Sequence, residues 1–427
     1  MIPENIQISK LSNGLTLITV SEPWKQGIYC YTYVKVGACD EQLERDKGIC
    51  HFIEHMVFRG TEDYTEEQIE KMITGRGGYY NAATSYSYTR YHLWTQKQYL
   101  NDSLSILNNL VFKPVIHNDL LNIERKVIEE EAMQYKSDPY SQACQKCNEL
   151  LFPKHNFRYP IIGTEESIKN ITSTRMREYI RGYYRPQTMI LTLCGNLPGQ
   201  SELENILYNN ANGFVRKTRA SNSSVLKRNF GEFDLPKEAI DTEETWKDIK
   251  SSVSCTSYPF DATEMYKKER ITLSILTTII GGDSNSMMFK QIRNEDGLCY
   301  SCGAYNTILM DNLGSYSFVL FSRNTNIKQA EEKLDKILHN VIKGKISDDE
   351  MNEAKNSLLG SHMRKMESGN YISMALTEAY LDETEKYNIL PWEFEKLVNS
   401  VSKKEIIGMA QKVLSSNQAR YRVLNDD

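Results

Sequence analysis

The sequence predicts an α+β fold of two similar domains, each built from helices packed on a mostly antiparallel sheet. Three observations support this prediction. The chain has 427 residues, which is long for one domain and comfortable for two. Helix-like and strand-like patterns alternate in both halves, and a faint internal repeat relates one half to the other.

The repeat relates segments that lie 230 positions apart. The helix, turn and strand pattern at 169–193 recurs at 399–423, and IHNDLLN at 116–122 aligns without a gap with ISDDEMN at 346–352. Between the two halves, residues 215–250 are polar and show no sustained helical periodicity. We therefore predict an N-terminal domain at 1–218, a linker at 219–245 and a C-terminal domain at 246–427.

Local patterns predict the elements of the first half in order. MIPENIQISKLSNGLTLITV at 1–20 favours two strands joined by a turn at Asn13-Gly14. EEQIEKMITG at 66–75 is helical and follows a capping box that begins at Thr65. GYYNAATSYSYTRYHLWTQ at 78–96 is rich in β-branched and aromatic residues, which favours strands. Helical periodicity returns at 101–112 and 120–135.

Composition argues against nucleic acid and membrane partners. The net charge is −5 and the basic residues are scattered, so no basic patch is expected. The longest apolar stretch, at 271–280, is far shorter than the roughly 20 residues of a membrane span. The N-terminus shows no secretion signal. We expect a soluble, cytoplasmic protein.

The nine cysteines show no disulfide framework and fit reduced thiols. Two CxxC pairs, Cys144/Cys147 and Cys299/Cys302, raise the alternative of a structural zinc site. The second pair lies in a strand-like stretch, where residues three apart point to opposite faces. We therefore interpret these cysteines as small buried hydrophobic residues.

Two histidines and a glutamate share one face of a predicted helix in GICHFIEHMVFRG at 48–60. His51 and His55 are four residues apart with Glu54 between them, so their polar groups converge. The apolar neighbours would bury this segment, and a buried imidazole pair beside a carboxylate is costly unless it is satisfied. A zinc ion would satisfy it.

A catalytic zinc site needs a third protein ligand and leaves the fourth position to water. IERKVIEEEAMQ at 123–134 offers Glu124 and Glu131, which are seven residues apart and share a helix face. The buried stripe of this helix is predicted to hold Val127 and Ile128, and its solvent-facing side Glu129 and Glu130.

The order HxxEH is the inverse of HExxH and is the signature of inverzincins. HFIEHMVFRG, GGYYNAATS, ERKVIEEEA and QIRNEDGLCYS together resemble the M16 metallopeptidase family, the group of pitrilysin, insulinase and the mitochondrial processing peptidase. FPKHNFRYPIIGTEESI at 152–168 and YYRPQTMILTLCGN at 183–196 also match the spacing of that family. The resemblance spans nearly the whole chain.

The resemblance implies that each chain binds one zinc ion. Its ligands would be His51, His55 and Glu131, with Glu54 as the general base that takes a proton from the zinc-bound water. Glu124 matches a glutamate of the family near the site. At the 230-residue offset, HFIEH falls on GGDSN at 281–285 and Glu131 on Ser361, so only the first half is expected to bind metal.

The resemblance also implies residues that hold substrate. Arg293 and Tyr300 match a pair in the family that binds the substrate carbonyl and the developing oxyanion. Asn81, Ala82 and Ala83 match an edge strand to which an extended peptide adds as a further strand. His92 is interpreted as a histidine of the sheet and not as a ligand, because the three-ligand set is already complete.

These expectations favour a zinc endopeptidase that cleaves unfolded peptides or small polypeptides. Members of the family that enclose a chamber within one chain have four related domains, so two domains imply a homodimer, or a heterodimer with a homologue of the same family. A noncatalytic partner or scaffold subunit is one alternative, and a zinc-free peptide-binding module is another. Peptide turnover and the processing of a leader peptide, precursor or presequence remain open as roles.

Overall fold

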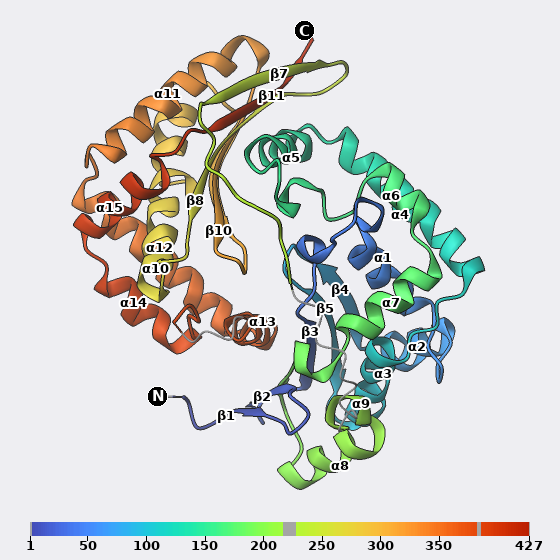
Figure 1. Cartoon of the computed structure of the whole chain (residues 1–427). Helices are drawn as coiled ribbons and strands as arrows, with labels where there is room; N and C mark the ends of the chain where they lie inside the picture. Colours follow the sequence, from blue (N-terminus) through green and yellow to red (C-terminus); the bar gives the residue numbers. More distant parts are fainter. Residues whose placement is uncertain (1, 217–227, 382–385, 427) are drawn as a thin grey trace. The chain divides into compact units, whose positions relative to one another are not determined.

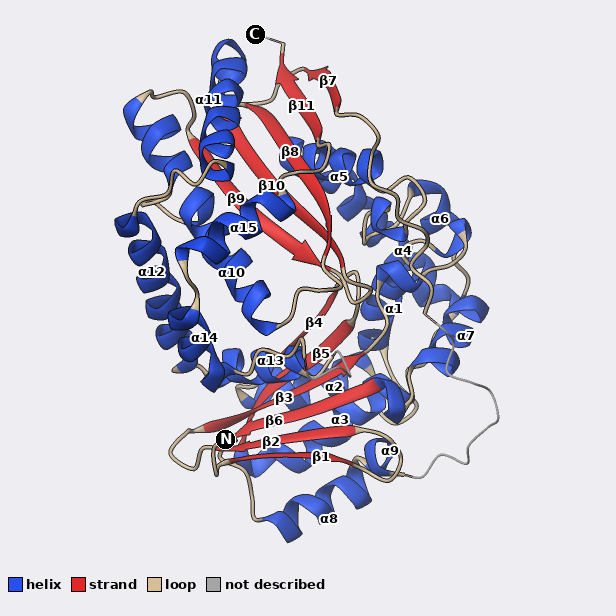
Figure 2. Ribbon diagram, turned by 60° about the vertical axis from the view of Figure 1, so that its left-hand side comes forward, coloured by secondary structure: helices blue, strands red, loops and turns tan. Residues whose placement is uncertain are grey.

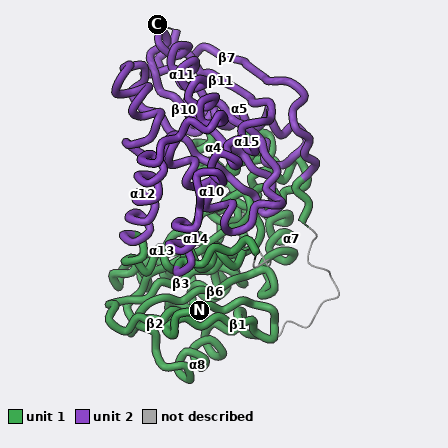
Figure 3. Tube along the Cα trace, turned by 90° about the vertical axis from the view of Figure 1, so that its left-hand side faces the viewer, with its two compact units in different colours: residues 1–132, 160–230, 365–391 green, residues 133–159, 231–364, 392–427 purple. Residues whose placement is uncertain are grey.

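The computed structural model describes residues 2–216, 228–381 and 386–426. They form two compact units that interleave along the chain (Figure 3). Unit 1 comprises Met1–Ala132, Pro160–Phe230 and Lys365–Pro391, and unit 2 comprises Met133–Tyr159, Gly231–Arg364 and Trp392–Asp427. None of the helices in the described ranges has the length and apolar character needed to cross a membrane.

Unit 1 is built on a six-stranded sheet with the strand order β1-β2-β6-β3-β5-β4 (Figure 2). All neighbouring strands are antiparallel except β2 and β6, which are parallel. The strands span Ile6–Lys10 (β1), Thr16–Ser21 (β2), Gly27–Val34 (β3), Tyr79–Thr84 (β4), Thr89–Gln96 (β5) and Met189–Gly195 (β6). The predicted turn at Asn13-Gly14 is confirmed, because Gly14 has a φ of +91° between the antiparallel strands β1 and β2.

Helices cover both faces of this sheet. One face carries the main apolar core, against which α1 and α3 pack. The helices of unit 1 span Ile49–Met56 (α1), Glu66–Ile73 (α2), Leu100–Phe112 (α3), Glu165–Asn170 (α6), Ser173–Tyr183 (α7), Gln200–Asn210 (α8), Asn212–Val215 (α9) and Gly369–Ala379 (α13), with most of α4 (Asn118–Ser137). The predicted capping box at the start of α2 is confirmed, since Thr65 and Gln68 bond reciprocally.

Unit 2 contains a five-stranded sheet with the order β7-β11-β8-β10-β9, in which only β7 and β11 are parallel. Its strands span Ile240–Trp246 (β7), Ser252–Asp261 (β8), Ser301–Ile308 (β9), Leu313–Ser322 (β10) and Ala419–Asn425 (β11). Its helices span Pro139–Leu151 (α5), Lys267–Thr277 (α10), Asn324–Ile342 (α11), Asp348–Met366 (α12), Phe394–Ser400 (α14) and Lys403–Val413 (α15). The predicted fold class, with two similar α+β domains, is confirmed.

The structure preserves the predicted 230-residue offset. Helix α7 and strand β6 recur as α15 and β11 with both ends shifted by 230 positions. Helix α5 likewise corresponds to α13, which begins 230 positions later. These two helices are exchanged: α5 follows α4 in the chain but packs on β8 and β11 of unit 2, and α13 packs on β3 and β6 of unit 1 (Figure 1).

Two long helices explain the exchange. Helices α4 and α12 have 20 and 19 residues, which at about 1.5 Å per residue makes each close to 30 Å long. Both pass from one unit into the other near their C-terminal ends, so the helix that follows each of them packs on the sheet of the other unit. The compact units therefore differ from the contiguous ranges predicted from sequence.

Ordered structure also reaches into the predicted linker at 219–245. Strand β7 begins at Ile240 and pairs in parallel with β11 along its whole length. Charged residues alternate along IDTEETW, so a search for helical periodicity and apolar segments does not detect this strand. Residues 219–227 of the predicted linker lie outside the described residues.

Candidate active site

Helix α1 forms because its apolar residues recur on one face. Ile49, Phe52, Ile53 and Met56 are at most 1 % exposed and join the core of unit 1. Gly48 precedes the helix with a φ of +86°, and a Cβ there would lie 2.4 Å from the carbonyl oxygen of Ile162. The opposite side of this short helix carries the two histidines and the glutamate.

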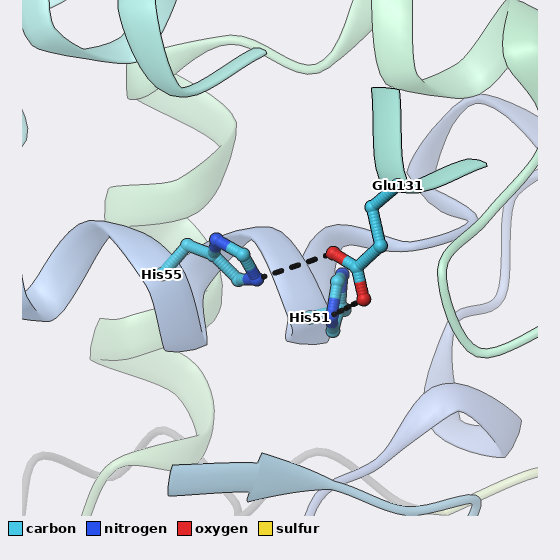
Figure 4. Close-up of side chains that lie close together, drawn as sticks. All are labelled: His51, His55 and Glu131. Atoms are coloured by element: carbon cyan, nitrogen blue, oxygen red, sulfur yellow. Dashed lines mark ion pairs between the residues drawn. The ribbon is translucent and has the colours of Figure 1, made fainter. Parts of the chain in front are cut away.

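Three side chains converge as the sequence predicts (Figure 4). His51 and His55 project from α1 towards Glu131, which comes from α4. His51 Nε2 lies 3.7 Å from Glu131 Oε1, and His55 Nε2 lies 3.6 Å from Glu131 Oε2. The side chains of His51, His55 and Glu131 are 12 %, 22 % and 47 % exposed, so the group opens to solvent on the Glu131 side.

This donor set fits zinc. A tetrahedral zinc ion holds nitrogen and oxygen ligands at about 2.0–2.1 Å, which places its donor atoms roughly 3.3 Å from one another. In the described part of the chain, one ligand atom from each of His51, His55 and Glu131 lies within 4.8 Å of the others. Two imidazoles and one carboxylate, with a side open to solvent, are the donors of a catalytic zinc site.

A buried glutamate fixes the orientation of His55. Glu124 is 5 % exposed and its Oε1 lies 2.8 Å from His55 Nδ1, which leaves Nε2 directed at Glu131. The other carboxylate oxygen of Glu124 accepts a 2.5 Å hydrogen bond from Nε of Arg59. Arg59 also pairs with Glu66 at 2.9 Å. His51 has no such support in the described protein, since its buried Nδ1 lacks a hydrogen-bond partner.

Glu54 stands beside the donor group without belonging to it. Its Oε2 accepts a 2.7 Å hydrogen bond from the hydroxyl of Thr84, at the end of β4. Burial raises the pKa of the Glu54 carboxyl above its ordinary value, although the Thr84 hydrogen bond and the charge of His55 oppose the shift. A carboxylate with a raised pKa is suited to accepting a proton.

The electrostatics of the two histidines differ. Burial, together with the charge of His55, lowers the pKa of His51 to about 3, so this imidazole is neutral and free to bind metal. Burial also acts to lower the pKa of His55, but the Glu124 hydrogen bond and the neighbouring carboxylates raise it above its ordinary value. Metal binding at His55 therefore competes with protonation more than metal binding at His51 does.

One detail of the predicted α4 is wrong. Val127 was expected in the buried stripe, but it is 45 % exposed, whereas Ile128 is 1 % exposed as predicted. Leu121, Glu124 and Ile128 are the buried residues of this helix. The inward face therefore includes the polar Glu124, and a prediction from apolar residues alone placed that face too close to Val127. Glu130 is exposed as predicted, and Glu129 is partly buried.

The predicted substrate strand is the edge strand β4 of the sheet in unit 1. The N–H of Ala82 donates to Asn81 Oδ1 at 2.8 Å. Asn81 is exposed and Ala83 is partly buried. His92 lies in β5 and stacks on Tyr31 with a ring separation of 4.7 Å, so it is a histidine of the sheet as predicted.

Arg293 and Tyr300 lie together in unit 2. Arg293 belongs to the π-helical segment Met288–Glu295, and its guanidinium carbon is 5.9 Å from the centre of the Tyr300 ring. The side chain of Tyr300 is 80 % exposed. The sequence thus identified a pair that the fold brings together, with Arg293 also stacked on Phe289 at 4.3 Å.

Sequence reasoning missed Thr84 and Arg59. Thr84 meets Glu54 across 30 positions of sequence, and Arg59 meets Glu124 across 65. Arg59 gave a usable signal, because it lies four residues after His55 in an otherwise apolar run and so on the same helical side. Thr84 gave none, since threonine is ordinary in a strand.

Comparison with known proteins identifies the family of this chain. Two family models match the chain: "Insulinase (Peptidase family M16)" over residues 16–165 and "Peptidase M16 inactive domain" over residues 170–358. The chain belongs to the M16 peptidase family. The M16 model that is named as inactive matches residues 170–358, which include Gly281 and Asn285, the positions that correspond to the two histidines at the 230-residue offset.

Relatives of this M16 protein include the uncharacterized zinc protease YmxG of Bacillus subtilis, 23 % identical over 420 residues and 95 % of both chains. An uncharacterized zinc protease of Rickettsia felis is 26 % identical over 97 % of this chain and 96 % of its own. The crystal structure of a protease from Helicobacter pylori matches the fold with a TM-score of 0.88 at 17 % identity, over 98 % of this chain and 99 % of that one.

Proposed function

We propose that this M16 protein is a zinc-dependent endopeptidase that hydrolyses unfolded peptides or small polypeptides. The observation that carries the proposal is the convergence of His51, His55 and Glu131 with Glu54 beside them. This combination supplies both a metal site and a separate proton acceptor, which metal-assisted hydrolysis of a peptide bond requires. The zinc protease names of its relatives agree with the proposal.

The residues have distinct roles in this mechanism. His51, His55 and Glu131 would hold zinc, which would supply a Lewis acid for the peptide carbonyl and for the attacking water. Glu54 takes up a proton from that water and returns it to the leaving amine, while the Thr84 hydroxyl holds its carboxylate in place. Glu124 keeps His55 in the orientation that directs Nε2 at the metal. Arg293 and Tyr300 supply donors for the substrate carbonyl and the oxyanion.

Substrate binding follows from the edge strand. An extended peptide that pairs with β4 gains main-chain hydrogen bonds irrespective of its sequence, which suits substrates without fixed structure. Such a peptide would displace the Asn81 side chain from the Ala82 N–H. A stably folded domain has no free strand to offer, so we expect the enzyme to cut it poorly.

A peptidase assay with a chelator tests the proposed function. We expect a disordered peptide of a few tens of residues to be cleaved internally, chelator to abolish cleavage and added Zn²⁺ to restore it. Mass spectrometry identifies the products, and a stably folded domain of ordinary size serves as the uncut control. Absence of cleavage across a diverse peptide library by the zinc-loaded protein would favour the alternative of a noncatalytic partner subunit.

We also propose that two chains assemble into a homodimer with two composite sites, in the cytoplasm. Two domains are too few to enclose an extended peptide, and this chain keeps both the zinc ligands and the Arg293–Tyr300 pair. The pair lies in the half whose positions equivalent to the ligands are Gly281, Asn285 and Ser361, so the pair would act in catalysis at a zinc ion that another half binds. Nine free cysteines fit a reducing compartment.

Complementation tests the assembly. We expect Glu54→Gln and Arg293→Ala to be nearly inactive alone, and a mixture after subunit exchange to regain about a quarter of the wild-type activity. Half of the dimers are then mixed, and each mixed dimer has one site with both defects and one with neither. Differently tagged subunits confirm the exchange. Persistent inactivity after confirmed exchange would favour a site within one chain or a different partner.

A further inference from the structure

The N-terminus of α1 is held by a carboxylate from outside the helix. Glu41 is completely buried, and its Oε2 accepts a 2.7 Å hydrogen bond from the N–H of Gly48 while its Oε1 accepts a 3.0 Å hydrogen bond from the N–H of Cys50. Gly48 occupies the N-cap position and has no side chain to bond these groups. The first N–H groups of a helix lack acceptors within the helix. Glu41 supplies the acceptor oxygens that Gly48 has no side chain to provide.

The segment that carries Glu41 is itself fixed. Its neighbour Asp40 is buried and pairs with Arg228 through two hydrogen bonds of 2.7 Å. Asp46 is buried and pairs with Arg175 at 2.9 and 2.6 Å. The ammonium group of Lys47 donates to the carbonyl oxygen of Glu41. The segment that carries Glu41 is therefore rigidly held, and the two hydrogen bonds of Glu41 connect it to the first turn of α1.

The position of that turn determines where the two histidines of the candidate metal site lie. Cys50 directly precedes His51, and His55 lies one turn further along the same eight-residue helix. Glu131 comes from a different helix, so any rotation or shift of α1 changes the distance from both imidazoles to Glu131. Zinc tolerates deviations of only about 0.2 Å in its ligand distances. Fixing the start of α1 therefore matters for metal affinity as well as for stability.

We infer that Glu41 is a positioning residue for the zinc site, which holds α1 so that His51 and His55 meet Glu131. The inference rests on the proposed function for its use of zinc. Both carboxylate oxygens accept N–H donors, so the amide of a glutamine must direct its NH₂ group at one of them. Glu41→Gln should therefore weaken the arrangement, and Glu41→Ala should remove it.

Zinc affinity of the folded protein tests this inference, measured by competition with a chromogenic chelator at a temperature where circular dichroism shows every variant folded. We expect about tenfold weaker zinc binding for Glu41→Gln and up to about 100-fold for Glu41→Ala. Glu331→Gln is the matched control, since it makes the same change at a buried carboxylate of unit 2, whose ion pair is with Arg422. It should stay within about twofold of wild type, because general destabilisation leaves the affinity of the folded protein unchanged.

Hydrogen exchange separates this inference from the proposed function. In the metal-free protein, amides in the segment 48–56 should exchange faster in Glu41→Gln than in Glu331→Gln, whether or not the enzyme cuts peptides. If Glu41→Ala does not fold, the comparison of Glu41→Gln with Glu331→Gln decides. Equal zinc affinities and equal exchange in these two variants would overturn the positioning role, even if the wild-type protein proves to be a zinc peptidase.

Discussion

Glu54→Gln is expected to reduce peptide cleavage by about 10²–10⁴-fold while leaving zinc bound. An amide of nearly the same shape keeps the hydrogen bond with Thr84 but cannot take a proton from the attacking water. Glu54 does not belong to the three-residue donor group, so metal binding should persist. Turnover of a fluorogenic peptide and zinc content are measured on the same preparation.

Glu67→Gln on α2 is the matched control for this change. Glu67 is exposed and lies outside the donor group, so its replacement should preserve both activity and zinc. Full turnover by the Glu54 variant would remove Glu54 from its role as base. Loss of zinc together with activity would instead make Glu54 a ligand or a support of one.

Glu131→Gln is expected to lose both zinc and activity. The carboxylate faces both imidazoles at 3.6 and 3.7 Å and carries the only formal negative charge of the donor group. A neutral amide is a much poorer zinc ligand, so the loss of affinity should exceed the 10–100-fold that is typical for residues that support a ligand. Zinc content after dialysis and the zinc dissociation constant measure this effect.

Glu130→Gln provides the comparison, because Glu130 is the exposed neighbour of Glu131 on the same helix. It should keep zinc and activity near the wild-type level. If the Glu130 variant lost zinc and the Glu131 variant kept it, the helix face assigned to the metal would be the wrong one.

Short-range periodicity predicted which side chains of the candidate site share a helix face. The spacing of His51, Glu54 and His55 required only that the segment be helical, and the seven-residue spacing from Glu124 to Glu131 placed both on one side of α4. The 230-residue offset held because each half repeats the same order of elements. These features depend on local geometry, which sequence spacing carries directly.

The spacing of residues in the sequence could not predict the packing between distant segments. The exchange of α5 and α13 depends on where the long helices α4 and α12 end in space. The misplacement of Val127 arose because a polar residue, Glu124, fills an inward position. Thr84 and Arg59 act through contacts between distant segments. Of these two residues, only Arg59 leaves a periodic signal in the sequence, four residues after His55, and that signal does not identify Glu124 as its partner.

The zinc content of the wild-type protein tests the central claim most directly. Protein purified without chelators is analysed for metals by elemental mass spectrometry, and again after incubation with Zn²⁺ and removal of the excess. The account predicts about one zinc per chain in the reconstituted protein, held by His51, His55 and Glu131. A folded protein that retains no zinc after reconstitution would contradict it.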